Sequence, residues 1–179
     1  FPSIIATRNI SPETLNCACC QTTTEFPTTD MFVPLNPNDA ERTFRQRARV
    51  DVFSSKIFPS ANASALQVPG LKTHTCARTH GFLGRVVAPI IERRMQLKNQ
   101  RKRKGDLFDL QQNALKWLLV TCFGYTGYKN ARFGRIEAHE AICAWAREIL
   151  LATISIAEDD GWDVLHAIVD CVWIENKNL

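Results

Sequence analysis

Apolar side chains recur at helical spacing in three stretches of the second half of the chain. The pattern predicts one helix over residues 81–104, a second over 107–123 after the break at Gly105, and a third over 136–157, which Gly161 closes. The apolar faces expected to pack inward are Phe82, Val86, Val87, Ile90, Ile91 and Met95 on the first helix, Leu107, Leu110, Ala114, Trp117 and Leu118 on the second, and Ala138, Ala141, Ile142, Trp145, Ile149, Ala152 and Ile156 on the third.

A short basic turn joins the first two helices, so we expect them to form an antiparallel hairpin. Residues 124–127, Gly-Tyr-Thr-Gly, are typical of a turn after the second helix. Two long helices are therefore expected side by side in the middle of the chain.

A strand is predicted over residues 164–174, because both of its alternating faces are mostly apolar and this favours burial in a sheet. Asp170 lies within this strand. A buried carboxylate costs several kcal/mol unless a metal ion, a Lys or an Arg pairs with it. The alternative is that Asp170 lies at a hairpin tip and is solvated.

The first part of the chain has less regular patterns. Residues 1–5 are a short apolar run, expected to be the end of a strand or a strand-to-helix corner. Ser11, Pro12 and Glu13 supply an N-cap, a first-turn proline and an early acid, which predict a brief helix. Residues 21–75 are rich in Thr, Pro, Asn and Ser, which favours loops and a hairpin with short β-like pieces such as residues 50–53.

Composition narrows the class of protein. The 179 residues are 45% hydrophobic and 22% charged, which suits one globular unit with a core and excludes a disordered chain. No apolar run approaches the roughly 18 residues that cross a bilayer, and no signal peptide opens the chain. The chain begins within an apolar run at Phe1, as expected for a piece of a longer protein. Seven cysteines, an odd number, argue against a complete disulfide framework and favour a reducing, cytoplasmic setting.

The net charge of +4 is unevenly distributed. Residues 85–104 are strongly basic, and residues 158–179 are strongly acidic. This favours a protein that binds phosphates at one place and metal cations at another. The alternative is a solvated loop and a solvated helix end.

Four cysteines are candidate metal ligands. Cys17, Cys19 and Cys20 contain a C-x-x-C pair, and Cys76 follows much later, near two histidines. Four soft ligands at tetrahedral reach would suit a structural Zn²⁺ ion. The alternative is three thiols in a loop and an unrelated buried Cys76.

Three segments resemble sequence motifs of the family B DNA polymerases, in the order and at the spacing of that family. Residues 1–5, FPSII, resemble the end of the first palm motif, DxxSLYPSII, with Phe1 at the tyrosine position. Residues 116–124, KWLLVTCFG, resemble the fingers motif KxxxNSxYG. Residues 166–171, HAIVDC, lie where the second palm motif, YGDTDS, is expected.

The resemblance implies an α/β (α+β) fold, in which a fragment of the polymerase palm sheet carries an antiparallel two-helix fingers hairpin. Residues 1–80 would be a palm portion with an irregular, cysteine-containing insertion, and residues 81–123 the fingers hairpin. Residues 124–179 would supply a palm helix and the motif-bearing strand. The remaining polymerase domains would lie outside this chain, in an intracellular, nucleoid-associated parent.

The resemblance also implies the ligands: primer–template DNA, a deoxynucleoside triphosphate and Mg²⁺. Asp170 is the implied catalytic carboxylate that holds Mg²⁺. Arg94 and Lys98, one helical turn apart, match a pair that contacts the triphosphate in this family, and Lys116 matches a third such cation. The alternative for all three cations is a solvated helix surface.

Two aromatic residues and the basic turn complete the implied site. Phe1 matches a ring that packs under the incoming sugar and excludes a 2′-hydroxyl, and Phe123 matches a ring beside the nascent base pair. Core packing is the alternative for both. The turn is expected to contact the DNA backbone, with affinity that falls as salt rises, or else to be a solvated loop. The turn residues are Arg101, Lys102, Arg103 and Lys104.

Two departures from the family pattern predict that polymerase activity is reduced. Ile168 stands at the first Asp of the second palm motif, and Val120 stands at the Asn of the fingers motif. We therefore expect two-metal, template-directed deoxynucleotidyl transfer to be impaired by roughly a thousandfold or more. The pattern is similar to a divergent, inactivated archaeal subgroup of the family. Two alternatives are a non-catalytic DNA-binding or regulatory replication or repair subunit and a zinc-stabilised interaction module.

Overall fold

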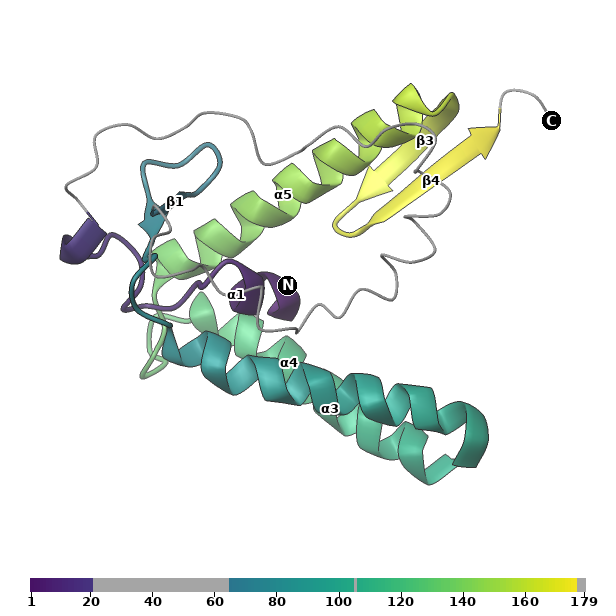
Figure 1. Cartoon of the computed structure of the whole chain (residues 1–179), viewed down its shortest axis with the longest axis horizontal. Helices are drawn as coiled ribbons and strands as arrows, with labels where there is room; N and C mark the ends of the chain where they lie inside the picture. The colour runs from purple at the N-terminus through teal and green to yellow at the C-terminus, as the bar shows by residue number, and fades with distance from the viewer. Residues whose placement is uncertain (21–64, 105, 177–179) are drawn as a thin grey trace.

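A computed structural model of the chain describes residues 1–20, 65–104 and 106–176 (Figure 1). The predicted β-like piece at residues 50–53 lies outside this described part. Among the described residues, no helix is both long and apolar enough to cross a membrane. The elements are α1 (Pro2–Thr7), the 3₁₀ turn η1 (Ala18–Cys20), β1 (Leu66–Gln67), β2 (His74–Thr75), α3 (Phe82–Lys104), α4 (Asp106–Thr126), α5 (Ile136–Asp159), β3 (Trp162–Ile168) and β4 (Cys171–Asn176).

The chain has the mixed helix and strand content that the sequence predicts, and its largest feature is the hairpin of α3 and α4. The two helices pack along each other and project from the rest of the molecule (Figure 1). Helix α4 continues to Thr126, so the predicted turn at residues 124–127 is wrong for its first three residues. At the end of the helix, the Thr126 hydroxyl donates a hydrogen bond to the Phe123 carbonyl at 2.6 Å.

The core lies where α1, α3, α4 and α5 meet. Helix α1 packs against all three long helices, which places it at the centre of the fold (Figure 1). The buried core residues are Ile5, Ile10, Leu15, Val68, Val87, Ile91, Leu119, Ala138, Ala141, Ile142, Ala144 and Trp145.

The predicted inward face is partly right on α3 and α5. Val87 and Ile91 are buried, whereas Val86 is 50% exposed. Met95 of α3 and Ile149 and Ile156 of α5 are also on the surface. Helix α5 leaves the core near its middle, and its second half contacts β3 and β4 instead of the other helices (Figure 1).

On α4 the predicted inward face is wrong. The described side chains that are buried on this helix are Gln112, Leu119 and Thr126, at 7%, 3% and 2% exposure, and they follow one another at seven residues, or about two turns. Apolar residues occur all round α4, so their periodicity does not identify the packed face. The residues expected inside but found exposed are Leu107, Leu110, Ala114, Trp117 and Leu118.

The single buried strand predicted over residues 164–174 is also wrong. Strands β3 and β4 form an antiparallel hairpin in which Ile168 pairs with Cys171, and Val169 and Asp170 make the turn between them. Val169 has a φ of 55°. Only α5 covers this two-stranded sheet in the described part of the chain, so most of its apolar side chains remain on the surface. The alternative interpretation, a solvated Asp170 at a hairpin tip, is the one that the structure has.

Residues 1–20 contain one α-helix, which agrees with the helical side of the expected strand-to-helix corner, and lack a second helix that the sequence predicts. The segment after Phe1 is the helix α1, with Pro2 in its first turn, and not the end of a strand. The expected helix at residues 11–14 is a turn, in which the Ser11 backbone N–H donates to the Thr14 hydroxyl at 2.9 Å.

The capping residues near position 13 serve α3 instead. The Phe82 backbone N–H donates to Glu13 Oε1 at 2.6 Å, and the Leu83 backbone N–H donates to Ser11 Oγ at 3.4 Å. Ser11 Oγ also donates to Glu13 Oε2 at 2.5 Å. The first N–H groups of a helix have no partner within it, so these side chains satisfy donors that α3 cannot. Ser11 and Glu13 therefore do cap a helix, but it is α3, some 70 residues later in the chain.

Replacing Glu13 with Gln is expected to lower the stability of the chain by about 0.5 kcal/mol at neutral pH, because a charged cap is lost at an exposed helix start. Burial raises the pKa of Glu13, but the Ser11 hydroxyl and the Phe82 N–H outweigh it and hold the pKa below its ordinary value. The stabilisation is therefore present above the ordinary pKa and is lost as pH falls through the lower folded value. Urea unfolding across pH checks this: the two proteins should converge in acid, and Glu92→Gln on the exposed side of α3 should change little. If the wild type and Glu13→Gln still differed in free energy of unfolding at low pH, the charge of Glu13 would not be the cause of the stabilisation.

Candidate nucleotide and metal site

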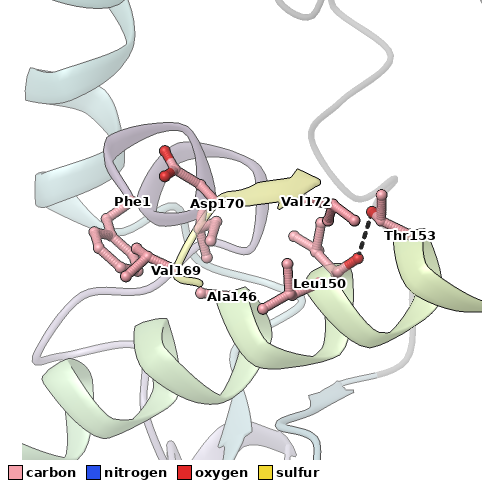
Figure 2. Close-up of a pocket in the computed structure, with 9 residues that line it drawn as sticks. Phe1, Ala146, Leu150, Thr153, Val169, Asp170 and Val172 are labelled. Atoms are coloured by element: carbon pink, nitrogen blue, oxygen red, sulfur yellow. Dashed lines mark hydrogen bonds between the residues drawn. The ribbon is translucent and has the colours of Figure 1, made fainter. Parts of the chain in front are cut away.

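Asp170 lines a small cavity between three elements. The cavity has a volume of about 150 Å³ and is lined by Phe1 and Ile4 at α1, by one side of α5, and by the β3–β4 turn. Figure 2 shows the Asp170 carboxylate pointing away from α5. The predicted neighbourhood of Phe1 and Asp170, far apart in sequence, is therefore present in the fold.

Phe1 and Phe123 stack on each other, with ring centroids 4.3 Å apart and an angle of 16° between the ring planes. Phe123 stacks in turn on His139 of α5, at 4.6 Å. His139 Nδ1 lies 3.2 Å from the Thr126 hydroxyl. A Cβ at Gly127 would lie 3.0 Å from the same nitrogen, so glycine leaves room for the imidazole. The stack joins α1, α4 and α5 beside Asp170, and Phe1 keeps 37% of its surface exposed.

Sequence reasoning missed His139. A single histidine on an amphipathic helix has no periodic signal, and only the pairing of α4 with α5 brings it to Phe123. Its role in the structure is to support the aromatic ring from behind.

The three predicted triphosphate cations lie on the α3–α4 hairpin. Arg94 is half-buried on α3, and Lys98 is exposed one turn further along. Lys116 is exposed on α4. Arg94 Nε is buried and has no hydrogen-bond partner within the described part of the chain. Arg101, Lys102, Arg103 and Lys104 lie at the end of α3, outside the residues whose side chains the structure describes.

Ile168 ends β3 beside the turn and is 52% exposed. No oxygen ligand is therefore present at this position. Asp163 does not replace it, because it pairs with Glu175 at the opposite end of the hairpin, about 17 Å along the strand. Asp170 is the one carboxylate among the residues that line the cavity.

The four cysteines predicted as ligands come together at η1 and β2. The Sγ atoms of Cys17, Cys19, Cys20 and Cys76 all lie within 4.8 Å of one another. Burial raises the pKa of Cys17, and hydrogen bonds with the neighbouring thiols raise it further. Burial would also raise the pKa of Cys76, but the backbone N–H groups of Arg78 and Thr79, together with hydrogen bonds from the thiols of Cys17 and Cys19, lower it to about 6. This group could hold a metal ion.

The family model for DNA polymerase family B matches residues 1–177 of the chain. The chain therefore belongs to DNA polymerase family B. This confirms the family that the three motifs indicated.

Two archaeal relatives show how much of a polymerase is present. The chain is 36% identical over 104 residues to DNA polymerase 2 of Saccharolobus solfataricus, covering 58% of this chain and 16% of that protein. It is 28% identical over 176 residues to the DNA polymerase of Thermococcus gorgonarius, covering 95% of this chain and 17% of that protein. The family B DNA polymerase of Pyrobaculum calidifontis has a similar fold, with a TM-score of 0.62 and 21% identity over 98% of this chain and 19% of that structure. The chain thus spans about a sixth of its relatives' length.

Proposed function

We propose that this chain is the nucleotide-binding part of a DNA-directed DNA polymerase. Residues 1–80 and 124–179 belong to the palm and residues 81–123 form the fingers. The observation that carries the proposal is the meeting of Asp170, from the β3–β4 turn, with Phe1 and its partner Phe123. The partners are a deoxynucleoside triphosphate and primer–template DNA, inside the cell at the nucleoid.

The residues at the cavity suit one magnesium ion better than two. Mg²⁺ binds carboxylate oxygens, water and substrate phosphates, and Asp170 supplies one such carboxylate. Within this chain, the position that matches a second palm ligand is Ile168, which has no oxygen. The Asp of the first palm motif would lie before Phe1, in the parent protein. When bound, Mg²⁺ would stabilise the charge that develops on the attacking and leaving oxygens.

The chain's own residues position the substrate. Arg94, Lys98 and Lys116 neutralise the triphosphate from a rigid pair of helices, so no side chain has to reorganise during the reaction. Within the described residues, the buried Nε of Arg94 has no hydrogen-bond partner, and a phosphate oxygen would accept from it. Phe1 places a flat surface under the sugar, and Phe123 and His139 keep that ring in place. The cations of residues 101–104 bind the DNA backbone.

Transfer by this polymerase is impaired, because one metal-binding carboxylate is missing. A non-catalytic DNA-binding subunit that keeps the polymerase scaffold is the second candidate, and the exposed Ile168 favours it. Primer extension by the parent enzyme tests the first proposal. Incorporation at a rate comparable to ordinary family members would contradict the impairment.

Replacing Lys116 with Ala is expected to weaken deoxynucleoside triphosphate binding about tenfold, because one phosphate contact is lost. Titration of a fluorescent deoxynucleotide into the parent enzyme measures this. Arg93→Ala is the matched control, since Arg93 lies next to Arg94 but is exposed and donates to Gln96 at 3.4 Å. Equal nucleotide affinities for the two variants would show that Lys116 does not contact the triphosphate. Salt-dependent DNA binding with no nucleotide binding would favour the second candidate.

A further inference from the structure

We propose that Cys17, Cys19, Cys20 and Cys76 bind a single structural zinc ion, which fixes the segment after α1 to the segment that leads into α3. Cys19 Sγ lies 3.4 Å from Cys17 Sγ, 3.8 Å from Cys20 Sγ and 3.5 Å from Cys76 Sγ. Cys20 Sγ lies 3.9 Å from Cys76 Sγ. Four sulfurs at about 2.3 Å from one tetrahedral Zn²⁺ are about 3.8 Å from each other, which is close to these separations.

The backbone brings the four thiols together without the metal. The 3₁₀ turn η1 places Cys19 and Cys20 on one side of the site, and Cys76 follows directly after β2. Leu15 pairs with Thr75 in an antiparallel bridge, and the Cys76 N–H donates to the Thr14 carbonyl at 2.8 Å. The site is therefore preorganised by contacts between segments that are far apart in sequence.

Asn9 holds the loop that carries Cys76. Its side-chain nitrogen donates to the carbonyls of Cys76 and Thr79, both at 2.8 Å, and its Oδ1 accepts from the Gly81 N–H at 2.8 Å. Asn9 is only 7% exposed and has a φ of 53°, in the left-handed region that asparagine tolerates. This side chain thus fixes the path from the cysteine site to the start of α3.

Backbone N–H groups and a histidine lie beside two of the four sulfurs. The backbone N–H groups of Arg78 and Thr79 point to Cys76 Sγ, at 3.4 and 3.3 Å. His74 Nε2 lies 3.6 Å from Cys17 Sγ and can donate to it when the ion is bound. Hydrogen bonds of this kind orient metal ligands and offset their negative charge.

One zinc ion fits this group better than a disulfide or an iron–sulfur cluster. A disulfide would join two sulfurs at about 2.05 Å and leave the other two thiols in contact with it. An iron–sulfur cluster binds its cysteines through different iron atoms, so it needs sulfurs further apart than a single ion does. Four protein ligands also close the coordination shell, which is typical of structural zinc. In Figure 1, η1 lies on the opposite side of α1 from the β3–β4 hairpin, so the ion would take no part in nucleotide chemistry.

Metal analysis of the chain, purified without chelator, tests the proposal. We expect about one zinc per chain, and less than about a fifth of that in Cys20→Ser and in Cys76→Ser. Cys143→Ser is the control, because Cys143 is exposed on α5 and outside the group. Titration of the metal-free wild type with Co²⁺ should give the intense thiolate-to-cobalt absorption of a four-sulfur site, which keeps the test valid if a variant does not fold.

Three results would overturn the zinc site: zinc far below one per chain with no cobalt band, iron with acid-labile sulfide, or a Cys20–Cys76 disulfide in the freshly purified protein. The outcome is independent of the polymerase proposal, because zinc content and nucleotide affinity are measured separately. A protein that contains zinc but does not bind a deoxynucleoside triphosphate would contradict the polymerase proposal and leave the zinc proposal intact.

Discussion

Replacing Ile168 with Asp is expected to raise the rate of primer extension by the parent polymerase by about a thousandfold. The substitution places a carboxylate at the end of β3, two positions from Asp170, where the proposed function lacks a metal ligand. Each lost metal ligand removes several kcal/mol of transition-state stabilisation, and about 4 kcal/mol corresponds to a thousandfold in rate. Ile168 is 52% exposed, so the new carboxylate is solvated and its cost in folding free energy is small.

Two control variants separate charge at this position from other effects. Ile168→Asn has the same shape as the Asp variant and no charge, and it should leave the rate close to that of the wild type. Leu165→Asp puts the charge on the same strand, at a position that is 64% exposed, and should also have no effect. Single-turnover primer extension measures all three variants. An unchanged rate for Ile168→Asp would show that this position does not hold metal.

The sequence predicts the long helices well because their signal is local and repeated. Helices α3 and α5 begin within one residue of the predicted position, and α4 begins one residue early. Their apolar residues recur over about three to five turns, so small errors at the ends do not change the assignment. The antiparallel hairpin follows from the shortness of its connection.

The packed faces and the last strand could not be predicted, because they depend on what surrounds each element. Trp117 and Leu118 suggest a core face as strongly as Leu119 does, yet only Leu119 is buried. The run around Asp170 has the composition of a buried strand, but a turn at Val169 divides it into a hairpin covered on one side. The composition of a segment does not determine which other elements pack against it.

In the candidate site too, some features follow from the sequence and others only from tertiary packing. The motifs assign Phe1 and Phe123 to one site in different roles, and the structure adds that the two rings stack on each other. The cysteine pattern predicts a cluster, and four sulfurs meet. The third ring, His139, has no motif and emerges only from the packing of α4 against α5. Residue identity therefore predicts which chemistry is present, and tertiary contacts determine which neighbours support it.

Replacing Ile142 with Ala is expected to destabilise the chain by about 2–5 kcal/mol, because its side chain is fully buried and its removal leaves a cavity. Ile142 is on the half of α5 that packs into the core, beside Ala138, Ala141 and Trp145. Ile156→Ala is the matched control on the same helix: Ile156 is 48% exposed, so its loss should cost less than about 1 kcal/mol. Urea unfolding gives both free energies, and the slope of the unfolding transition should be alike in both variants. Equal destabilisation would contradict this core, because it would mean that the outer half of α5 is as closely packed as the inner half.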